Sequence, residues 1–571
     1  MQRSHPSLSQ SPAPSSSIRK TRWFVTGLIS LVLLLGIGFR VIYLEQKAYW
    51  VDEVHTAVRV AGYTKADITA ERFNNQAYSV TDLKTYQIPG ADPSLGDVLN
   101  TLAQHPEHPP LYYLLARWWM QAAMALGVSP SVTVTRSLSI LFSLLALPCV
   151  VGLCQELFRS KQTALIALTI FALSPLHILY GQEAREYSLW TVITLLSCWA
   201  FLRAVRQPSV KRWTLYGLTL TVGWYSHLLF ATVAIAHTLY VFLYEHLPSH
   251  AATAAAVMTN LSQANDDGLA QRSSSYGPLI SPKIPFLITL AISLLFFSPW
   301  IGVFLHQFGQ VQNVVDATQR DPSLSYLVNV WGRNLSRVWF SADLGSANIL
   351  WVAGVMYALG YLWQTLPKRI SVFILLLIGV NALGLMVPDA ITGGISSTRI
   401  RYLIPAYVGI QLAIAHLFSH HLLKRKGWVR RGWQMVLIGV FTSGAIAGCI
   451  NTTHVTHWAK SDKSLYYSQM AEVINASEHP LVITDNSATY TLVLAHQLKD
   501  AVNVQLVDLE QLERPRDLAI PHTVNGSSIG DIFLFAPSPP LRRVLEKKGM
   551  GPFEPVVRQS DRFQLLKAKR R

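Results

Sequence analysis

Charged residues are scarce in this chain: only 14% of its 571 residues are Asp, Glu, Lys or Arg, whereas 50% are hydrophobic. A soluble domain carries about 25% charged residues, so the composition excludes an ordinary soluble protein. The mean hydropathy is +0.28. Apolar runs long enough to cross about 30 Å of hydrocarbon recur along the sequence. Together these features predict a polytopic membrane protein.

Cysteine is also scarce, with four residues that form neither a CxxC motif nor a Cys/His ligand spacing. Neither a zinc site nor a disulfide framework is therefore indicated. Acidic residues are outnumbered, and the formal net charge is +16. Such an excess can mark a nucleic-acid-binding protein, but here the basic residues cluster in short loops between apolar runs. This is the pattern of the positive-inside rule, and it predicts no nucleic-acid partner.

The first apolar run covers residues 24–44 and follows Arg19, Lys20 and Arg22. A signal peptide also has basic residues before its apolar core, but this run is too long and no small-residue cleavage site follows it. We therefore expect a retained first helix with its N-terminus in the cytoplasm. The Ser/Pro-rich segment 1–22 is expected to be cytoplasmic and disordered.

About eleven transmembrane helices are predicted in a membrane domain that extends from residue 23 to residue 450. The expected ranges are 24–44, 133–157, 162–179, 188–204, 213–229, 231–247, 285–304, 347–366, 370–388, 402–421 and 433–450. With this topology the basic loops fall on the cytoplasmic side, as the positive-inside rule requires. The stretch 248–284 is predicted to be a flexible cytoplasmic loop.

The topology depends on the segment after Pro110, within the first extracytoplasmic loop (45–132). Apolar residues recur there at helical spacing and include Trp118 and Trp119, whereas Tyr113 and Arg117 lie on the opposite face. Such a helix could cross the membrane or lie flat with its aromatic rings at headgroup level. If it crossed, every basic loop behind it would face outward. We therefore expect a flat, juxtamembrane helix.

The last part of the chain, residues 451–571, is predicted to be a separate extracytoplasmic domain. Its pattern reads as strand, helix, strand, strand, which fits a small α/β domain, and it has no nucleotide-binding glycine signature. The expected fold is thus an all-α polytopic membrane domain with juxtamembrane helices in its first outer loop, followed by a small α/β domain.

Three polar clusters fall on the outer face of the predicted membrane domain. They lie in the stretches "AYWVDEVHTA", "YGQEAREYS" and "SSTRIRYLIPA", and their charged residues include Asp52, Glu53, Glu183, Arg185, Arg399 and Arg401. Basic residues in short outer loops run against the positive-inside bias, and binding of an anion at the membrane surface is one reason for their presence.

Each cluster also has a purely structural interpretation. Asp52 and Glu53 are then solvated residues at the start of a loop, and Arg185 pairs locally with Glu183 or Glu186. Arg399 and Arg401 contact lipid headgroups, and His108 is a turn residue before two prolines. The sequence leaves these alternatives open.

The clusters together fit the chemistry of transfer from an anionic lipid donor. A carboxylate at the membrane surface can take the proton of an attacking hydroxyl group. Guanidinium groups can hold a phosphate and stabilise the charge that develops on it as it leaves. A lipid-linked donor needs no nucleotide-binding site.

The stretches "WVDEVHTA", "EHPPLYYLLARWW", "SPLHILYGQEAREYSLW" and "RIRYLIPA", in this order, resemble the GT-C glycosyltransferases. The resemblance is greatest to the bacterial relatives of protein O-mannosyltransferases and aminoarabinose transferases, and it covers roughly residues 24–450. It implies an inverting transfer of a sugar from a polyprenyl-phosphate donor to a glycan, lipid or protein acceptor. The reaction is expected on the outer face of the inner (plasma) membrane, with membrane lipids as further partners.

The resemblance also implies roles for the polar residues by their positions. Asp52 matches the general base, with Glu53 as its catalytic neighbour. His108 stands where some relatives have a lysine that contacts the lipid phosphate, and a neutral histidine offers a hydrogen bond in place of a full charge. The remaining donor-binding or phosphate-binding candidates are Glu183, Arg185, Arg399 and Arg401. No cofactor is expected, and a divalent metal at Asp52 and Glu53 is not favoured.

Two other functions compete with this interpretation. A transporter or flippase for a lipid-linked glycan would typically show internal repeats and ionisable residues near mid-membrane. No repeat is evident here, and His237 is the main mid-span candidate. A ligase that joins a glycan to a polymer would use the same types of site residue with another donor. The sequence does not separate it from a glycosyltransferase.

Overall fold

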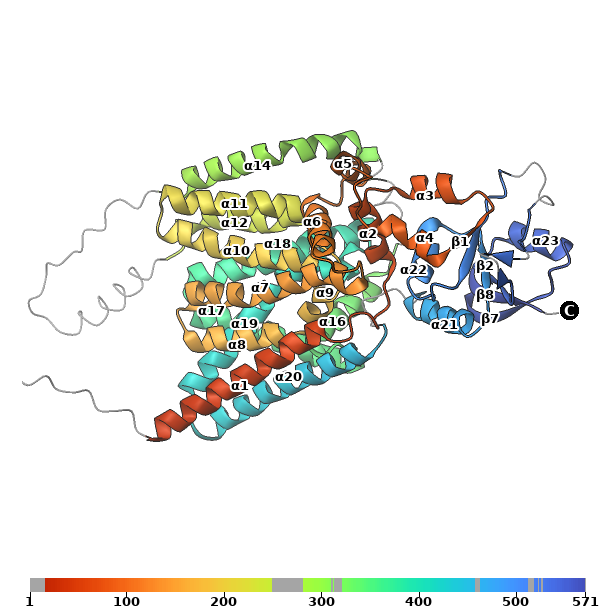
Figure 1. The fold of residues 1–571 in the computed structure, drawn as a ribbon. Helices are drawn as coiled ribbons and strands as arrows, with labels where there is room; N and C mark the ends of the chain where they lie inside the picture. The colour runs from red at the N-terminus through yellow and green to blue at the C-terminus, as the bar shows by residue number, and fades with distance from the viewer. Residues whose placement is uncertain are drawn as a thin grey trace, which may run out of the picture.

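The computed structural model describes residues 16–248, 281–309, 312, 321–456, 463–511, 518–521, 523–524 and 527–569. A bundle of long helices makes up most of the chain, and a small mixed domain stands at one end of it (Figure 1). The predicted fold class, a helical membrane domain with a C-terminal α/β domain, is confirmed. The predicted loop 248–284 lies almost entirely outside the described residues.

Each of the eleven predicted spans overlaps a described helix, and the span 162–179 overlaps the bent pair α8–α9. By length and composition, seven described helices can cross a membrane, or eight if the bent pair α8–α9 is one span; two shorter apolar stretches are Gly27–Val41 and Phe230–Tyr244. A multi-pass membrane protein is thus supported, while the number eleven stays a prediction. The helices are α1 Ser16–Val41, α7 Val132–Phe158, α8 Lys161–Leu173, α9 Pro175–Gly181, α10 Tyr187–Arg206, α11 Val210–Ser226, α12 Phe230–Tyr244, α14 Lys283–His306, α17 Asn348–Thr365, α18 Lys368–Thr392, α19 Ile404–Lys424 and α20 Gly427–Thr453.

The first helix begins earlier than predicted. Residues 16–22 belong to α1, and no proline or glycine interrupts the chain between Pro14 and Gly27. The remaining part of the predicted disordered segment, residues 1–15, lies outside the described residues.

A fully buried arginine ties α1 to the bent pair α8–α9. The Arg40 guanidinium donates to the carbonyls of Phe171 and Ala172 at 3.1 and 2.7 Å and to Ser143 Oγ at 2.8 Å. These carbonyls are in the last turn of α8, which ends before Pro175 with a bend of 53° to α9. The last turn of a helix lacks hydrogen-bond partners and carries partial negative charge. Arg40 therefore satisfies a helix end that would otherwise be buried without partners.

The first outer loop folds into short helices at the same end of the bundle as the C-terminal domain (Figure 1). Three of these helices begin at a Ser or Thr whose side chain accepts a hydrogen bond from an Asp three residues later, which is a capping box. The helices are α2 Val51–Ala61, α3 Lys65–Arg72, α4 Val80–Lys84, α5 Leu95–Ala103 and α6 Leu111–Ala125.

Helix α6 is the predicted juxtamembrane helix. Tyr112, Tyr113 and Arg117 are buried against the protein, whereas the side of the helix with Trp118 and Trp119 is exposed. Arg117 donates to the carbonyls of Val60 and Pro93 and so holds the loop together. The exposed tryptophans fit a helix that lies in the membrane interface. A further helix, α16 Leu324–Phe340, was not predicted in the late outer loop.

The C-terminal domain is a six-stranded mixed sheet in the order β1-β3-β2-β6-β8-β7. The central pairs β3/β2 and β2/β6 are parallel, and the outer pairs are antiparallel. This agrees with the predicted α/β pattern. The strands are β2 Leu481–Thr484, β3 Asn503–Leu506, β6 Ile532–Phe535, β7 Phe553–Ser560 and β8 Phe563–Ala568; the helices are α21 Lys463–Asn475, α22 Ala488–Ala495 and α23 Pro539–Lys547; a separate pair is formed by β4 Thr523–Val524 and β5 Ser527–Ser528.

The edge strand β1 (Ala77–Ser79) comes from the first outer loop and not from the C-terminal segment. Tyr78 pairs with Val504 in an antiparallel register. A single hydrophobic core contains Val54 and Ala57 of α2 together with Leu492 and Phe535 of the C-terminal domain. The first outer loop and the C-terminal domain therefore form one packed unit, although the sequence separates them by several hundred residues.

Candidate functional site

Helix α2 lies between the helical bundle and the C-terminal domain. Asp52, Thr56 and Arg59 recur at helical spacing and share one face of α2. Val54 and Ala57 lie on the opposite face, in the core of the C-terminal unit. The hydrophobic pattern thus turns the polar face of α2 toward the bundle, where two other loops meet it.

The first contact across this face joins Asp52 to Arg401. Arg401 Nη1 lies 3.4 Å from Asp52 Oδ2, and the two side chains are 12% and 23% exposed. Arg401 belongs to the 3₁₀ turn Ile400–Leu403 that leads into α19, and its guanidinium lies 5.8 Å from the ring of Trp50. An acid and an arginine that are far apart in the sequence therefore meet in a partly open position.

Arg185 approaches α2 from the bend between α9 and α10. Its Nη1 donates to the backbone carbonyl of Asp52 at 3.3 Å and to Thr56 Oγ1 at 3.1 Å. Its Nη2 forms an ion pair with Glu186 at 3.0 Å. The structure thus contains the local pair that the sequence allowed, and the same guanidinium also fixes the start of α2.

His108 lies at the same cluster, before α6. Its Nδ1 is 3.6 Å from Glu186 Oε1 and its Nε2 is 3.9 Å from Glu107 Oε1, and its side chain is 24% exposed. Burial, with the charge of Arg59, lowers the pKa of His108 despite the neighbouring Glu186. The imidazole is therefore neutral near pH 7 and can form a hydrogen bond without a full charge.

The surrounding arginines control the protonation of Asp52. Burial alone would raise the pKa of Asp52, but the charges of Arg401 and Arg185 outweigh this effect and lower it below its ordinary value. Burial and the charge of Arg59 lower the pKa of the neighbouring His55 to about 3. At neutral pH the face of α2 thus presents a carboxylate and a neutral imidazole.

Glu53 has a different environment from Asp52. Its side chain is fully buried, and its two carboxylate oxygens each lie 2.7 Å from a nitrogen of Arg136 on α7. The backbone N–H of Ala184 donates to the same carboxylate at 3.0 Å. This bidentate pair fastens the start of α2 to the bundle and to the bend that carries Arg185.

The remaining predicted site residues, Glu183 and Arg399, are less central. Glu183 is buried, and its backbone carbonyl accepts from Arg185 N at 2.7 Å. Arg399 is half-buried in the turn before Arg401. Within the described ranges, no hydrogen bond or ion pair joins the Arg399 side chain to Asp52 or Arg185.

Several polar atoms of the cluster have no hydrogen-bond partner among the described residues. They include Arg185 Nε, Arg401 Nε and Glu186 Oε2, all of them buried. A buried donor without a partner costs about 1–3 kcal/mol, and an anion bound between the two guanidinium groups would satisfy both of their N–H groups. No group of three or more His, Cys, Asp or Glu side chains in the described part of the chain is placed to hold a metal ion.

Three residues that complete the cluster were not among the site residues predicted from the sequence, although Glu186 was considered as a local partner of Arg185. Glu186 pairs with Arg185 and contacts His108, Thr56 accepts from Arg185, and Arg136 holds Glu53. Glu186 lies within the recognised stretch "QEARE", and Thr56 follows Asp52 by one helical turn, so both carried a local signal. Arg136 carried only a weak one, as a single charge near the start of an apolar run.

Residues 107–261 match the model of the family described as dolichyl-phosphate-mannose-protein mannosyltransferase. The predicted resemblance is confirmed. The matched segment begins beside His108, contains Arg136 and Arg185, and makes this part of the chain similar to a family of glycosyltransferases. No curated protein matches the chain.

Three solved structures are similar to the chain. ArnT from Cupriavidus metallidurans bound to undecaprenyl phosphate has 13% identity and a TM-score of 0.47, over 96% of this chain and 98% of that chain. The Archaeoglobus fulgidus oligosaccharyltransferase tethered with an acceptor peptide has 13% identity and a TM-score of 0.44, over 85% and 65%. The oligosaccharyltransferase AglB from Archaeoglobus fulgidus, in complex with an inhibitory peptide and a dolichol-phosphate, has 12% identity and a TM-score of 0.43, over 84% and 65%. The chain thus spans about two thirds of the length of the archaeal enzymes.

Proposed function

We propose that this protein transfers a sugar from a polyprenyl-phosphate donor to an acceptor hydroxyl on the outer face of the plasma membrane. The observation that carries the proposal is the contact of the Asp52 carboxylate with Arg401, beside buried N–H groups of Arg185 and Arg401 that have no partner in the described chain. The match to a family named for a dolichyl-phosphate-linked sugar supports this class of donor.

In the proposed reaction, the acceptor oxygen attacks the anomeric carbon of the donor sugar. The bond between that carbon and the phosphate oxygen breaks, its electron pair leaves with the polyprenyl phosphate, and the configuration inverts. Asp52 takes the proton of the acceptor hydroxyl. Arg401 and Arg185 stabilise the charge on the departing phosphate. Phosphate binding requires Arg401 to share its charge between the phosphate and Asp52, which increases the basicity of the carboxylate when the donor is bound.

An apolar groove next to His108 supports a lipid donor. It has a volume of about 520 Å³ and lies between α5, α6, α11 and α14. Trp300 lines the groove and donates to the carbonyl of Pro106 at 3.1 Å, two residues before His108. In our proposal the polyprenyl chain lies in this groove and its phosphate reaches the arginines past His108.

We assign a positioning role to Glu53 in place of the catalytic role predicted from the sequence. Its side chain is fully buried and both of its oxygens bind Arg136, so the carboxylate is not accessible to a substrate. The same pair makes Glu53 a poor metal ligand, and the proposed reaction uses no bound metal. We assign Glu183 a structural role in the bend between α9 and α10 that carries Arg185. Arg399 is assigned a place outside the donor site.

The proposed topology has a cytoplasmic N-terminus and an extracytoplasmic C-terminal domain. The start of α1 and the C-terminal domain lie at opposite ends of the bundle (Figure 1). The basic loops at 206–212 and 424–431 join α10 to α11 and α19 to α20 at the end of the bundle remote from α2 (Figure 1), as the positive-inside rule requires for this orientation.

Replacement of Arg401 tests the donor site. Arg401→Gln removes a charged contact to the phosphate, which contributes about 1.5–3 kcal/mol, so the KM for a polyprenyl-phosphate sugar should rise about 10-fold to 100-fold in proteoliposomes. Arg399→Gln is the matched control two residues away and should change KM less than threefold. An equal effect of both variants, or no effect of either, contradicts the assignment of Arg401.

The pH dependence of transfer tests the state of Asp52. Its pKa is lowered, so the carboxylate is lost only as the pH falls through a value below the ordinary pKa of about 3.9. In the native enzyme kcat/KM should therefore stay flat from about pH 7 to about pH 5. In Arg401→Gln the fall of kcat/KM on the acid side of the pH profile should move to higher pH. The reason is that this variant lacks the main charge that lowers the pKa of Asp52. An unshifted fall in that variant speaks against Asp52 as the titrating base.

A flippase is the second candidate, and sealed vesicles separate it from an enzyme. The expected result is a covalent glycosylated product and free polyprenyl phosphate. Translocation of the intact lipid-linked sugar without any covalent product would overturn the proposed function.

A further inference from the structure

An apolar groove lies between α17, α19 and α20 and extends to the end of the bundle that is remote from α2 (Figure 1). It has a volume of about 420 Å³, and its lining includes Tyr357 of α17, Leu417 of α19 and Trp433 of α20. None of the described residues that line it is charged. All three helices are long and apolar enough to cross a membrane. The groove is therefore an apolar space among membrane helices.

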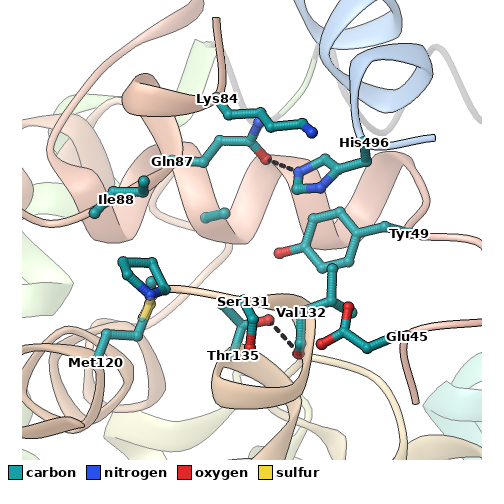
Figure 2. Close-up of a pocket in the computed structure, with 12 residues that line it drawn as sticks. Glu45, Tyr49, Lys84, Gln87, Ile88, Met120, Ser131, Val132, Thr135 and His496 are labelled. Atoms are coloured by element: carbon teal, nitrogen blue, oxygen red, sulfur yellow. Dashed lines mark hydrogen bonds between the residues drawn. The ribbon is translucent and has the colours of Figure 1, made fainter. Parts of the chain in front are cut away.

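The groove has room for a further molecule. A methyl group added at Gly354 or at Gly432, both of which line it, would meet no heavy atom within 4 Å beyond its chain neighbours and the backbone of its own helix. The polar pocket in Figure 2 is different in kind, because it joins two parts of the protein. There, His496 Nε2 of the C-terminal domain lies 2.7 Å from the carboxamide oxygen of Gln87 in the first outer loop. The groove is instead open to the surroundings of the bundle.

These surroundings are lipid. Tyr357 and Val436 line the groove on helices that can span a membrane, and they are 51% and 53% exposed. Trp428, at the start of α20, also lines the groove and is 83% exposed, as is typical of a tryptophan at headgroup level. Apolar side chains that are exposed on a membrane span contact hydrocarbon chains. The occupant that fits the groove is therefore a lipid chain.

The depth of the groove fits one leaflet. Its lining reaches Ile414, ten residues before the end of α19 at Lys424, and Val436, nine residues after the start of α20. At 1.5 Å per residue this is about 13–15 Å along each helix. On α17 the lining reaches Trp351, which is about 21 Å from the end of that helix. Half of the hydrocarbon core is about 15 Å thick, so the groove is about as deep as one phospholipid chain is long.

Three consecutive basic residues stand where the groove meets the end of the bundle. Lys424, Arg425 and Lys426 are all exposed, and Lys424 lies two turns beyond Leu417 on the same face of α19. No Asp or Glu occurs in the sequence between Asp389 and Asp462. A run of basic side chains thus overhangs the apolar groove.

Arg425 is linked to the groove through a stack of aromatic rings. The ring of Trp433, in the groove, stacks on His421 at 4.2 Å, and His421 stacks on Tyr361 at 4.7 Å. Arg425 lies close enough to both His421 and Tyr361 to act on them electrostatically. The positive charge is therefore placed directly above the apolar lining.

The positive-inside rule alone does not require this arrangement. At the same end of the bundle, Arg206 pairs with Glu156 at 2.9 Å, and Lys283 pairs with Glu245. The rule counts basic residues and is satisfied by such compensated ones. No carboxylate in the described part of the chain pairs with residues 424–426. Uncompensated charge above an apolar groove of leaflet depth has both parts of a site for an amphipathic anion.

We infer that this groove binds an anionic phospholipid from the leaflet on the side of the basic loops. One acyl chain lies in the groove, and the phosphate of the headgroup lies among Lys424, Arg425 and Lys426. A zwitterionic lipid carries a positive charge to the same place and should bind more weakly. The inference does not depend on the proposed function, because the groove lies at the other end of the bundle from Asp52.

Competition between two lipids with the same acyl chains tests this inference. The full chain in detergent is incubated with dioleoyl phosphatidylglycerol and dioleoyl phosphatidylcholine, and the bound lipids are counted by native mass spectrometry. Phosphatidylglycerol should be preferred at least about 10-fold. Lys424→Gln/Arg425→Gln should weaken its binding about 10-fold to 30-fold, since each basic residue near a headgroup contributes about fivefold.

Arg430→Gln/Arg431→Gln is the matched control for charge. It removes two exposed arginines from the same basic segment, but these side chains leave α20 on the side opposite to Trp428 and Gly432. It should change the binding of phosphatidylglycerol less than threefold. If Lys424→Gln/Arg425→Gln does not fold, Arg425→Gln/Lys426→Gln serves as the second variant.

Gly432→Leu tests the groove itself. The larger side chain would fill space that the acyl chain needs, so the binding of phosphatidylglycerol should fall about 10-fold, which corresponds to about two buried CH₂ groups. Gly439→Leu is the matched control, because Gly439 lies two turns further along the same face of α20, also has open space beside it, and does not line the groove.

Three results would overturn the inference. Equal retention of the two lipids would remove the preference for an anion. An equal loss in both double arginine or lysine variants, or binding that Gly432→Leu leaves unchanged, would reduce the effect to a general surface charge. Displacement of phosphatidylglycerol by an equal concentration of polyprenyl phosphate would make the groove a site for the carrier lipid instead. None of these results depends on sugar transfer, so the inference and the proposed function can fail separately.

Discussion

Asp52→Asn is expected to lower kcat for sugar transfer by about 10²–10⁴-fold, the contribution typical of a general base. The amide has the size of the carboxylate but cannot accept the proton of the acceptor hydroxyl. The Asp52 side chain is 23% exposed and forms one ion pair, with Arg401 at 3.4 Å, so the substitution should leave the fold intact. Transfer is measured in proteoliposomes with a radiolabelled polyprenyl-phosphate sugar, and folding is measured by the apparent Tm.

The matched control is Asp67→Asn, at an exposed position in the same outer loop. It should keep at least half of the native activity. Because Arg401 loses its carboxylate partner in Asp52→Asn, that variant should bind polyprenyl phosphate as tightly as the native protein or more tightly. Full activity of Asp52→Asn in purified protein would remove Asp52 from the mechanism, whereas loss of donor binding would assign it to the donor site.

Glu53→Gln is expected to lower the stability of the fold, whereas Asp52→Asn is expected to lower kcat and leave the fold intact. It leaves the fully buried Arg136 guanidinium without its carboxylate, and breaking a buried pair in this way costs about 3–5 kcal/mol. The apparent Tm should fall strongly, and activity should fall with the fraction of folded protein. Thermal unfolding followed by tryptophan fluorescence and size-exclusion chromatography measures this effect.

The double variant Glu53→Met/Arg136→Met separates a structural pair from a catalytic acid. Removal of both charges should be less destabilising than removal of one, since no uncompensated charge remains in the interior. Any folded double variant should retain measurable transfer at its Asp52 site. A well-folded double variant without any transfer activity would return Glu53 to the catalytic residues.

The helices were predictable because their signal is local. A run of about twenty apolar residues has few alternatives to a membrane helix, and each predicted range coincides with a helix such as α7 or α10. The face of α6 was predictable for the same reason, since the spacing of its tryptophans sets the exposed side. Asp52, Arg185 and Arg401 could be placed at one end of the bundle because the topology predicted from the basic loops puts all three of their loops on the outer side.

The pairing of those charges was not predictable, because sequence spacing says nothing about which partner a side chain meets. Glu53 binds Arg136 across 83 residues, and its neighbour Asp52 meets Arg401. Two adjacent acids on a helix point in directions about 100° apart, so they reach different surroundings. The strand β1 was missed for a similar reason, since three residues carry too little pattern to indicate a partner strand in the C-terminal domain.

The strand β1 has a consequence for biosynthesis. Asn75, just before β1, accepts a hydrogen bond from Gln505, which lies 430 residues later in the chain. At about 5–20 residues per second, a ribosome needs roughly 20–90 s to add those residues. During that interval the first outer loop lacks its partner strand, and α2 lacks the core that aligns Asp52. The newly made helices can therefore insert and bundle before the proposed active centre is assembled, and under the proposed function transfer activity appears only when the last segment of the chain has folded against the first.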